Sequence, residues 1–398
     1  MTEVQSEQTE HFPIFDPQSI AAEPDRHLPP RRVSLFGAPA WLLSRYDEVR
    51  ECLSNPALSP VAAYAAEHGQ HSPLSGLFAD TVMASNAPEH TRLRRPLSRV
   101  FSARRVEQLR PRIQEITDAL LDEIAAEHGA DLLQALTVPQ PMLVICELLG
   151  VPGADREQFH RQAQAMLAAG FNPEAAEAAQ TASAELWDYL EELTERKRRE
   201  PGNDLISDLL AINEEERLSL RELVATSRVL MIAGYDLTSN FIANAVMSLL
   251  SNPEAAAPLR EHPEIDLRGV DELLRRDGPG AFAMRVANVE ITIGGTELKP
   301  GEQVLLDLEA ADTDPSRFVD AAKLDLAREG AAHVQFGHGM HYCVGAPLAR
   351  VEGQISINAL FQRFPDIELA KPADELGRNP NPFQRALSEL PVRFTPRV

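Results

Sequence analysis

Hydrophobic residues recur at three- and four-residue intervals over most of the chain from about position 45 to 260, with Pro and Gly between the segments. This spacing places apolar side chains on one face of a helix, so it predicts an α-rich region. The pattern changes between Val286 and Leu308, where short β-branched runs surround Gly294-Gly295 and Pro300-Gly301. Such runs around turn residues are typical of hairpins. The sequence therefore predicts a mainly α fold with a small β region.

The longest expected helix begins after Ser219 and ends at Asn252-Pro253. Ser219 and Glu222 form a capping box, in which each side chain bonds a backbone N–H that the helix leaves free. At about 1.5 Å per residue this helix spans roughly 50 Å. Its apolar middle contains four small or polar residues, Gly234, Asp236, Thr238 and Ser239. A carboxylate in an apolar helix needs a partner or water. A polar kink on a partly exposed face is one interpretation, but a functional site is favoured, because an apolar helix rarely keeps a carboxylate and two hydroxyls together without use.

Composition and charge restrict the partners of this chain. Its 398 residues are 44% hydrophobic and 25% charged, which is ordinary for a folded protein. The formal net charge of -22 disfavours nucleic acid and anionic lipid as partners. No segment has the pattern of a signal peptide or a membrane span, so we expect a cytoplasmic protein. We expect one domain over residues 1–398, with 1–15 as a flexible tail.

The three cysteines, Cys52, Cys146 and Cys343, are far apart and form neither a zinc motif nor a disulfide pattern. Cys52 and Cys146 lie in apolar helical sequence and are expected to be inert. Glycines lie on both sides of Cys343, and Pro347 with the apolar run beyond it predicts that a helix begins just after the cysteine. The helix dipole and free N–H groups at such a position favour a thiolate, which is the form that binds metals.

The segment from Phe336 to Gly345 resembles the haem-binding signature of the cytochrome P450 family, F-G-x-G-x-[HR]-x-C-x-G, and matches it at every specified position. The resemblance extends over nearly the whole chain and is similar to the soluble bacterial, actinobacterial-type branch. It implies haem b between the long helix and the helix after the cysteine. It also implies that Cys343 is the axial ligand of the iron, with Phe336 and Gly345 beside the cofactor.

Other family motifs occur in the expected order. Glu272 and Arg275 match the E-x-x-R motif. In the family a later arginine joins this ion pair, and the resemblance assigns that role to Arg328. Four basic residues occupy the positions that contact haem propionates in the family, namely His90, Arg94, Arg285 and His341. Charge-assisted hydrogen bonds to carboxylates suit these residue types.

Residues 233–239 resemble the family motif of the long helix, in which an acid followed by threonine relays protons during oxygen activation. Asp236 supplies the acid, but Leu237 stands in place of threonine and Thr238 lies one residue further, about 100° round the helix. Asp236, Leu237 and Thr238 are therefore the candidate catalytic positions. The departure makes reactions other than plain hydroxylation more plausible, with Ser239, Thr238, water or the substrate supplying the missing hydroxyl.

The resemblance also implies a substrate pocket with small and apolar walls. Its predicted residues are Val229, Ile232, Ala233, Leu237, Ala281, Phe282, Ala283, Phe383 and Gln384. The loop from Val61 to Met83 and the segment around Phe171 would cover the entrance. These features imply a medium to large, mostly apolar substrate, such as an intermediate of bacterial secondary metabolism.

The leading interpretation is a monooxygenase that uses O2 and receives electrons from a ferredoxin and its reductase. Six arginines between Thr91 and Val106, with no acidic residue among them, form a candidate docking face for an acidic ferredoxin. Peroxide-dependent or oxidative-coupling chemistry is a second possibility because of Leu237. A haem carrier or sensor without turnover is a third, but it needs neither Asp236 nor a docking face. A cysteine hydrolase is weaker still, because no Asn or Asp is recognisable to orient a catalytic His.

Overall fold

The structure is a computed structural model that describes residues 16, 20, 25–35, 37–69, 78–168, 176–212, 218–330, 332–379 and 381–396. The expected tail at 1–15 lies outside these residues. So do positions 70–77 of the first predicted entrance loop and the whole segment around Phe171.

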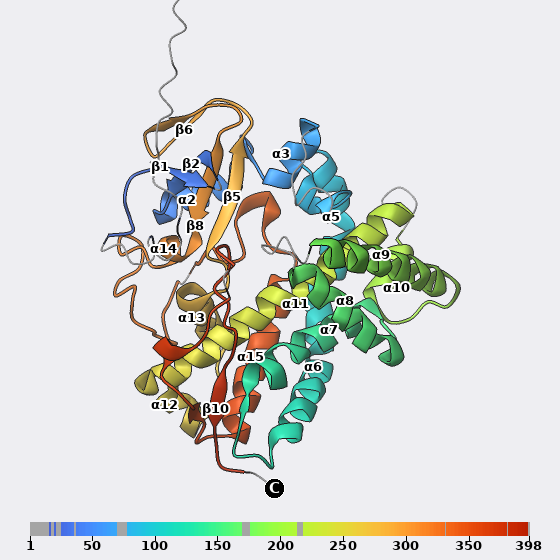
Figure 1. Cartoon of the computed structure of the whole chain (residues 1–398), viewed down its shortest axis with the longest axis vertical. Helices are drawn as coiled ribbons and strands as arrows, with labels where there is room; N and C mark the ends of the chain where they lie inside the picture. Colours follow the sequence, from blue (N-terminus) through green and yellow to red (C-terminus); the bar gives the residue numbers. More distant parts are fainter. Residues whose placement is uncertain are drawn as a thin grey trace, which may run out of the picture.

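Helices make up most of the described chain (Figure 1). They are α2 (Tyr46–Ser54), α3 (Val61–Glu67), α5 (Glu89–Val100), α6 (Ala103–Ile124), α7 (Pro139–Leu149), α8 (Arg156–Ala168), α9 (Ala176–Arg199), α10 (Leu205–Leu210), α11 (Leu220–Ser251), α12 (Pro253–Glu261), α13 (Leu267–Asp277), α14 (Leu308–Asp312) and α15 (Ala346–Arg363). The strands are β1 (Arg31–Leu35), β2 (Ala38–Leu43), β3 (Leu58–Ser59), β4 (Gly129–Asp131), β5 (Phe282–Ala287), β6 (Ile291–Ile293), β7 (Thr296–Leu298), β8 (Gln303–Asp307), β9 (Glu368–Leu369) and β10 (Pro391–Arg393).

The largest sheet gathers strands from both ends of the chain. Its order is β1-β2-β8-β5-β3, with β2 and β8 parallel and the other pairs antiparallel. β6 and β7 form the predicted hairpin, and both glycines of the Gly294-Gly295 turn have positive φ. Figure 1 shows this sheet to one side of the helices, with α11 running obliquely through the middle of the molecule. The prediction of a mainly α fold with a small β region is confirmed.

Helix α11 is the central element of the helical part. Ser219 and Glu222 form the predicted capping box, and the helix ends at Ser251 just before Asn252-Pro253. It packs against α7, α9, α13 and α15, and most of its side chains are buried. A helix surrounded in this way can be apolar on nearly every face.

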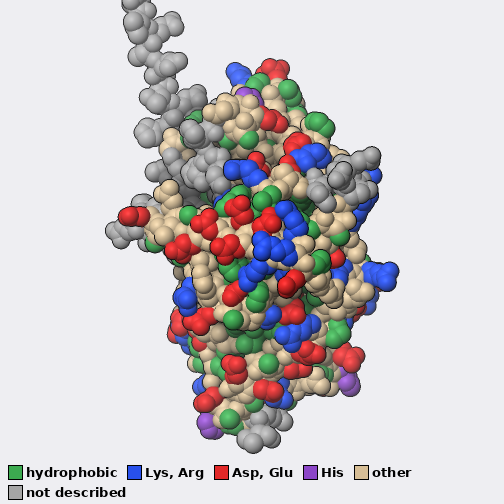
Figure 2. Space-filling model, turned by 90° about the vertical axis from the view of Figure 1, so that its right-hand side faces the viewer, with side chains coloured by type: hydrophobic (Ala, Val, Ile, Leu, Met, Phe, Trp, Pro, Cys, Tyr) green, Lys and Arg blue, Asp and Glu red, His purple; other side chains and the backbone are tan. Residues whose placement is uncertain are grey.

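The described helices include none that combines the length and apolar composition needed to cross a membrane. On the face of the molecule shown in Figure 2, acidic and basic side chains intermix, and apolar ones are scattered among them. This is the ordinary composition of a protein surface in water.

Candidate functional site

The loop before α15 holds Cys343 by backbone contacts. The N–H of Cys343 donates to Phe336 O at 2.9 Å, which closes the loop on itself. Gly339 has φ 75°, and a Cβ built there would lie 2.7 Å from the Cα of Ser54 in α2. Only glycine therefore fits at this position. Helix α15 begins at Ala346, with Gly345 as its N-cap.

The environment of the Cys343 thiol contains opposing effects. Protein atoms close around the sulfur although the residue is accessible, and this burial raises the pKa of the thiol. Hydrogen bonds from the backbone N–H groups of Gly345 and Ala346, and the charges of Arg94 and Arg350, lower the pKa. A cation bound at the sulfur would add to these favourable interactions, so the site is suited to a thiolate that ligates a metal.

Four basic side chains from three separate elements converge beside the cysteine loop. His90 of α5 and His341 of the loop have their ring centroids 4.4 Å apart. Arg94, one turn after His90, donates to Tyr342 O at 2.7 Å, and the buried Arg285 of β5 donates to Met284 O at 2.9 Å. The structure thus brings together the four residues that the resemblance assigned to propionates.

Burial and mutual repulsion disfavour the charged forms of these basic side chains when no anion is bound. Burial and the neighbouring His90, Arg285 and Arg94 lower the pKa of His341 to about 3, and burial lowers the pKa of Arg285 to about 10. The Nε2 atoms of His90 and His341 are buried and have no hydrogen-bond partner among the described residues. Such a group of donors and cations is complementary to a pair of carboxylates.

The E-x-x-R residues form a second, fully bonded cluster. Arg275 donates from Nε and Nη2 to the two Glu272 oxygens at 2.7 and 2.9 Å. Arg328 Nε lies 3.0 and 3.1 Å from the same two oxygens. The remaining guanidinium N–H groups reach backbone carbonyls, including Asp312 O and Val319 O. These contacts tie α13 to the segment that leads into the cysteine loop.

The middle of α11 presents two different faces. Ala233 and Leu237, one turn apart, are exposed in a helix that is otherwise largely buried, and Leu237 is 39% exposed. Asp236 is mostly enclosed, and its Oδ2 accepts a hydrogen bond from Gln384 Nε2 at 2.7 Å. Burial raises the pKa of Asp236, while hydrogen bonds from Gln384 and Asn240 lower it. Thr238 is buried on another side of the helix, so it does not share the Leu237 face.

The other predicted pocket residues come from three segments. In α11, Val229 is buried and Ile232 is partly buried. Ala281 and Phe282 are buried among side chains of the main sheet, and Phe383 packs against the same cluster. Ala283 of β5 is partly buried. The N–H of Ala281 donates to Phe383 O at 3.0 Å, so the structure places these two predicted walls side by side.

Sequence reasoning missed the role of one of these residues. Gln384 was predicted only as a pocket wall, but its amide bonds the carboxylate of Asp236 and receives a hydrogen bond from Asn240. A signal was present, because Asp236, Asn240 and Asn244 are spaced four apart and therefore share one helical face.

The donor set fits haem. Among the described residues, no group of three His, Cys, Asp or Glu could hold a metal ion directly. A metal with Cys343 as its one protein ligand must therefore be held mainly by another molecule. A macrocycle with two carboxylates meets this need, since the basic cluster described above lies beside the cysteine.

Comparisons with known proteins agree with this arrangement. The family model described as Cytochrome P450 matches residues 26–266 and 268–387. The chain is 38% identical over 372 residues to the vitamin D(3) 25-hydroxylase of Pseudonocardia autotrophica, covering 93% of this chain and 91% of the relative. It is 35% identical over 405 residues to the 6-deoxyerythronolide B hydroxylase of Saccharopolyspora erythraea, covering 99% and 100%.

A solved structure, the bacillaene polyketide synthase cytochrome P450 PksS of Bacillus subtilis 168, superposes with a TM-score of 0.86 at 34% identity. The match covers 92% of this chain and 94% of that chain. The chain therefore belongs to the cytochrome P450 family, whose cofactor is haem b and whose typical activity is monooxygenation.

Proposed function

We propose that this enzyme oxidises a medium to large, mostly apolar small molecule, an intermediate of bacterial secondary metabolism, with O2 and electrons from a ferredoxin. The observation that carries the proposal is the convergence of Cys343, at the start of α15, with the basic cluster of His90, Arg94, Arg285 and His341. The substrate class is supported by two relatives, whose names give vitamin D(3) and 6-deoxyerythronolide B as their substrates. The exposed Ala233 and Leu237 supply an apolar wall for such a molecule.

Each group of residues has a distinct task in this proposal. Bound haem supplies the chemistry of oxygen activation through its thiolate-ligated iron. Cys343 holds the iron through Sγ, and the N–H groups of Gly345 and Ala346 stabilise its negative charge. The basic cluster binds the propionates. Asp236 holds and transfers a proton at its carboxyl group, and Leu237 excludes stray water from the reacting side.

The carbon monoxide complex of the reduced holoprotein tests the central assignment. We expect the strongly red-shifted Soret band of thiolate ligation, and Cys343→Ala should abolish it. Cys146→Ala is the matched control, because this buried thiol has its pKa raised to about 12 and should not ligate. A wild-type spectrum typical of histidine-ligated haem in freshly folded protein would refute the proposal.

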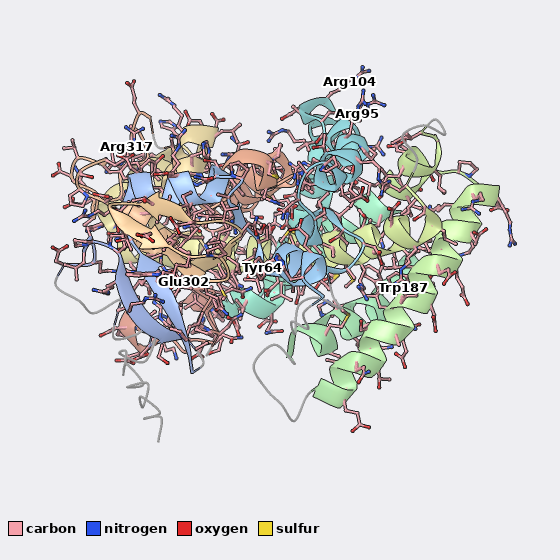
Figure 3. All side chains as sticks on the ribbon, turned by 90° about the horizontal axis from the view of Figure 1, so that it is seen from above. Tyr64, Arg95, Arg104, Trp187, Glu302 and Arg317 are labelled. Atoms are coloured by element: carbon pink, nitrogen blue, oxygen red, sulfur yellow. The ribbon has the colours of Figure 1, made fainter. Side chains whose placement is uncertain are left out.

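The electron donor is proposed from the basic surface of α5 and the start of α6. Arg95, Arg99 and Arg104 are exposed, and Arg95 and Arg104 project outward at one edge of the molecule (Figure 3). Arg92 and Arg105 pair with Glu222 and Asp208, and Arg94 belongs to the haem cluster. Reversing Arg95 or Arg99 to Glu should slow ferredoxin-driven reduction, most strongly at low salt, and leave ligand affinity unchanged. If ferredoxin-driven reduction responds neither to these substitutions nor to salt, this surface is not the docking site of the electron donor.

Leu237 raises a second candidate function, peroxide-dependent or oxidative-coupling chemistry, which can be separated from the first by experiment. A leucine cannot donate a hydrogen bond, and in this proposal the native substrate, or water that it orders beside Asp236, completes the proton relay. Leu237→Thr should then improve product yield per electron for analogues that lack polar groups, and do little for the native substrate. If wild type wastes most electrons as peroxide with its own substrate, peroxide-dependent or oxidative-coupling chemistry is the better description.

A further inference from the structure

Three polar residues spaced four apart on α11 bond to the loop that contains Gln384 and Arg385. Asp236 Oδ2 accepts from Gln384 Nε2 at 2.7 Å, and Asn240 Nδ2 donates to Gln384 Oε1 at 3.3 Å. One turn further, Asn244 Nδ2 donates to Arg385 O at 2.8 Å. The three side chains thus make a row of hydrogen bonds along one face of the helix, and two of these bonds are to the Gln384 amide.

The backbone on either side of Gln384 is held by the segment that precedes β5. Ala281 N donates to Phe383 O at 3.0 Å, and Arg385 N donates to Pro279 O at 2.8 Å. Gln384 also forms an isolated bridge with Gly280. Because both chain neighbours are anchored, the direction in which the Gln384 side chain leaves the loop is restricted.

The chemistry of the amide restricts its orientation as well. An ionised carboxylate can only accept hydrogen bonds, so the NH2 end of Gln384 must face Asp236. The carbonyl end then faces Asn240, whose amide donates to it. Donors and acceptors along Asn240, Gln384 and Asp236 therefore run in one direction, an arrangement in which each bond strengthens the next.

The charged side chain that follows Gln384 in the loop is engaged elsewhere. Arg385, the nearest cation along the loop, donates to Arg276 O and pairs with Asp277 and Glu309. On α11 itself, the Tyr235 phenol interacts electrostatically with Asp236, and its ring meets the edge of His160 from α8 at 6.0 Å. Among the described residues, the Asp236 carboxyl thus accepts hydrogen bonds from two neutral amides and has no counter-ion.

We propose that Gln384 is the positioning residue of Asp236: its amide, oriented by Asn240, holds the carboxyl in one orientation beside the face where α11 is open. This inference rests on the proton role of Asp236 in the proposed function. Gln384 follows Phe383, a predicted pocket wall, so the loop that supplies this wall also supplies a hydrogen bond that favours the ionised form of Asp236.

Infrared titration of the holoprotein tests the positioning role without a substrate. The C=O stretch of protonated Asp236 is assigned by its loss in Asp236→Asn. In Gln384→Met, which keeps length and bulk but cannot hydrogen-bond, the ratio of protonated to ionised carboxyl at a given pH should rise about tenfold, as loss of one hydrogen bond to a charged group implies. Asn244→Ala is the matched control, since it removes the hydrogen bond to Arg385 O and leaves the Asp236 contacts in place. An unchanged titration in Gln384→Met, or an equal change in Asn244→Ala, would overturn the proposal.

A second measurement separates this inference from the proposed function. Peroxide released per NADH oxidised is followed against pH with a surrogate ferredoxin and reductase and no added substrate. On the acidic side of this pH profile, we expect the change in peroxide release to occur at higher pH in Gln384→Met. In Asp236→Asn we expect peroxide release to lose its pH dependence. A wild-type profile in Asp236→Asn contradicts the proton role of Asp236. A changed profile in Asp236→Asn together with a wild-type profile in Gln384→Met contradicts only the positioning role.

Discussion

Two groups of ionisable side chains, each wholly or partly buried, differ in whether an opposite charge balances them. In the first, both oxygens of Glu272 are bonded by two arginines, Arg275 and Arg328, and the other guanidinium N–H groups reach carbonyls. In the second, His90, Arg94, Arg285 and His341 lie together without a carboxylate that bonds them among the described residues.

The difference separates a structural site from a binding site. Buried charges are tolerated where they are paired and fully hydrogen-bonded, as around Glu272. A group of buried and half-buried basic side chains without a counter-charge raises the free energy of the folded protein, and an anionic ligand removes that penalty on binding. The first cluster therefore stabilises the fold by itself, whereas the second is expected to stabilise it only with haem bound.

The largest expected effect is on the balanced cluster. Glu272→Ala leaves two guanidinium groups without their carboxylate, one of them fully buried, and should lower the free energy of unfolding by about 3 to 5 kcal/mol. Urea denaturation of the holoprotein measures the change. Glu89→Ala, which removes an exposed carboxylate paired with Arg92, is the control and should cost less than about 1 kcal/mol. Equal losses for the two variants would refute the comparison.

Arg285→Met should have opposite effects on the apoprotein and the holoprotein. Removal of a buried cation is expected to leave the apoprotein as stable as wild type or more stable, because burial already disfavours the charge. Haem should dissociate about tenfold faster or more, since a hydrogen bond to a charged group contributes about 1.5 to 3 kcal/mol. Transfer of haem to an excess of acceptor protein gives the rate. Arg104→Met, an exposed arginine, is the control. If Arg285→Met destabilises the apoprotein and leaves the rate of haem loss unchanged, Arg285 stabilises the fold and does not bind haem.

His341→Phe sharpens the comparison through pH, with the smallest expected effect. The folded apoprotein holds the pKa of His341 at about 3, against an ordinary value of 6.5. The unfolded chain therefore binds more protons between these values, and wild-type stability falls as pH decreases from about 6.5 to 3. His341→Phe should lack this contribution, so its stability relative to wild type should increase towards acid pH. The difference should shrink in the holoprotein, where propionates favour the charged imidazole. A pH-independent difference in the apoprotein would contradict this interpretation.

Local features of the fold could be predicted because neighbouring residues produce them. The capping box at Ser219 and Glu222, the Gly294-Gly295 turn and the start of a helix just after Cys343 each depend on a few adjacent positions. The haem signature is of the same kind, because its glycines and cysteine act within one loop. The order of strands in the main sheet could not be obtained in this way, since β2 pairs with β8 across most of the chain.

The sequence by itself thus determined the elements, the thiolate loop and the residue types available for haem and proton transfer. Only the tertiary structure decided which of them meet. Gln384 bonds Asp236 across 148 positions, and no local pattern states which loop will cover a given turn of α11. Arg94 and Arg95 are adjacent in sequence, yet one turns to the cysteine loop and the other is exposed. The physical reason is that burial and long-range hydrogen bonds, which set the charge and orientation of these groups, depend on the packing of distant segments.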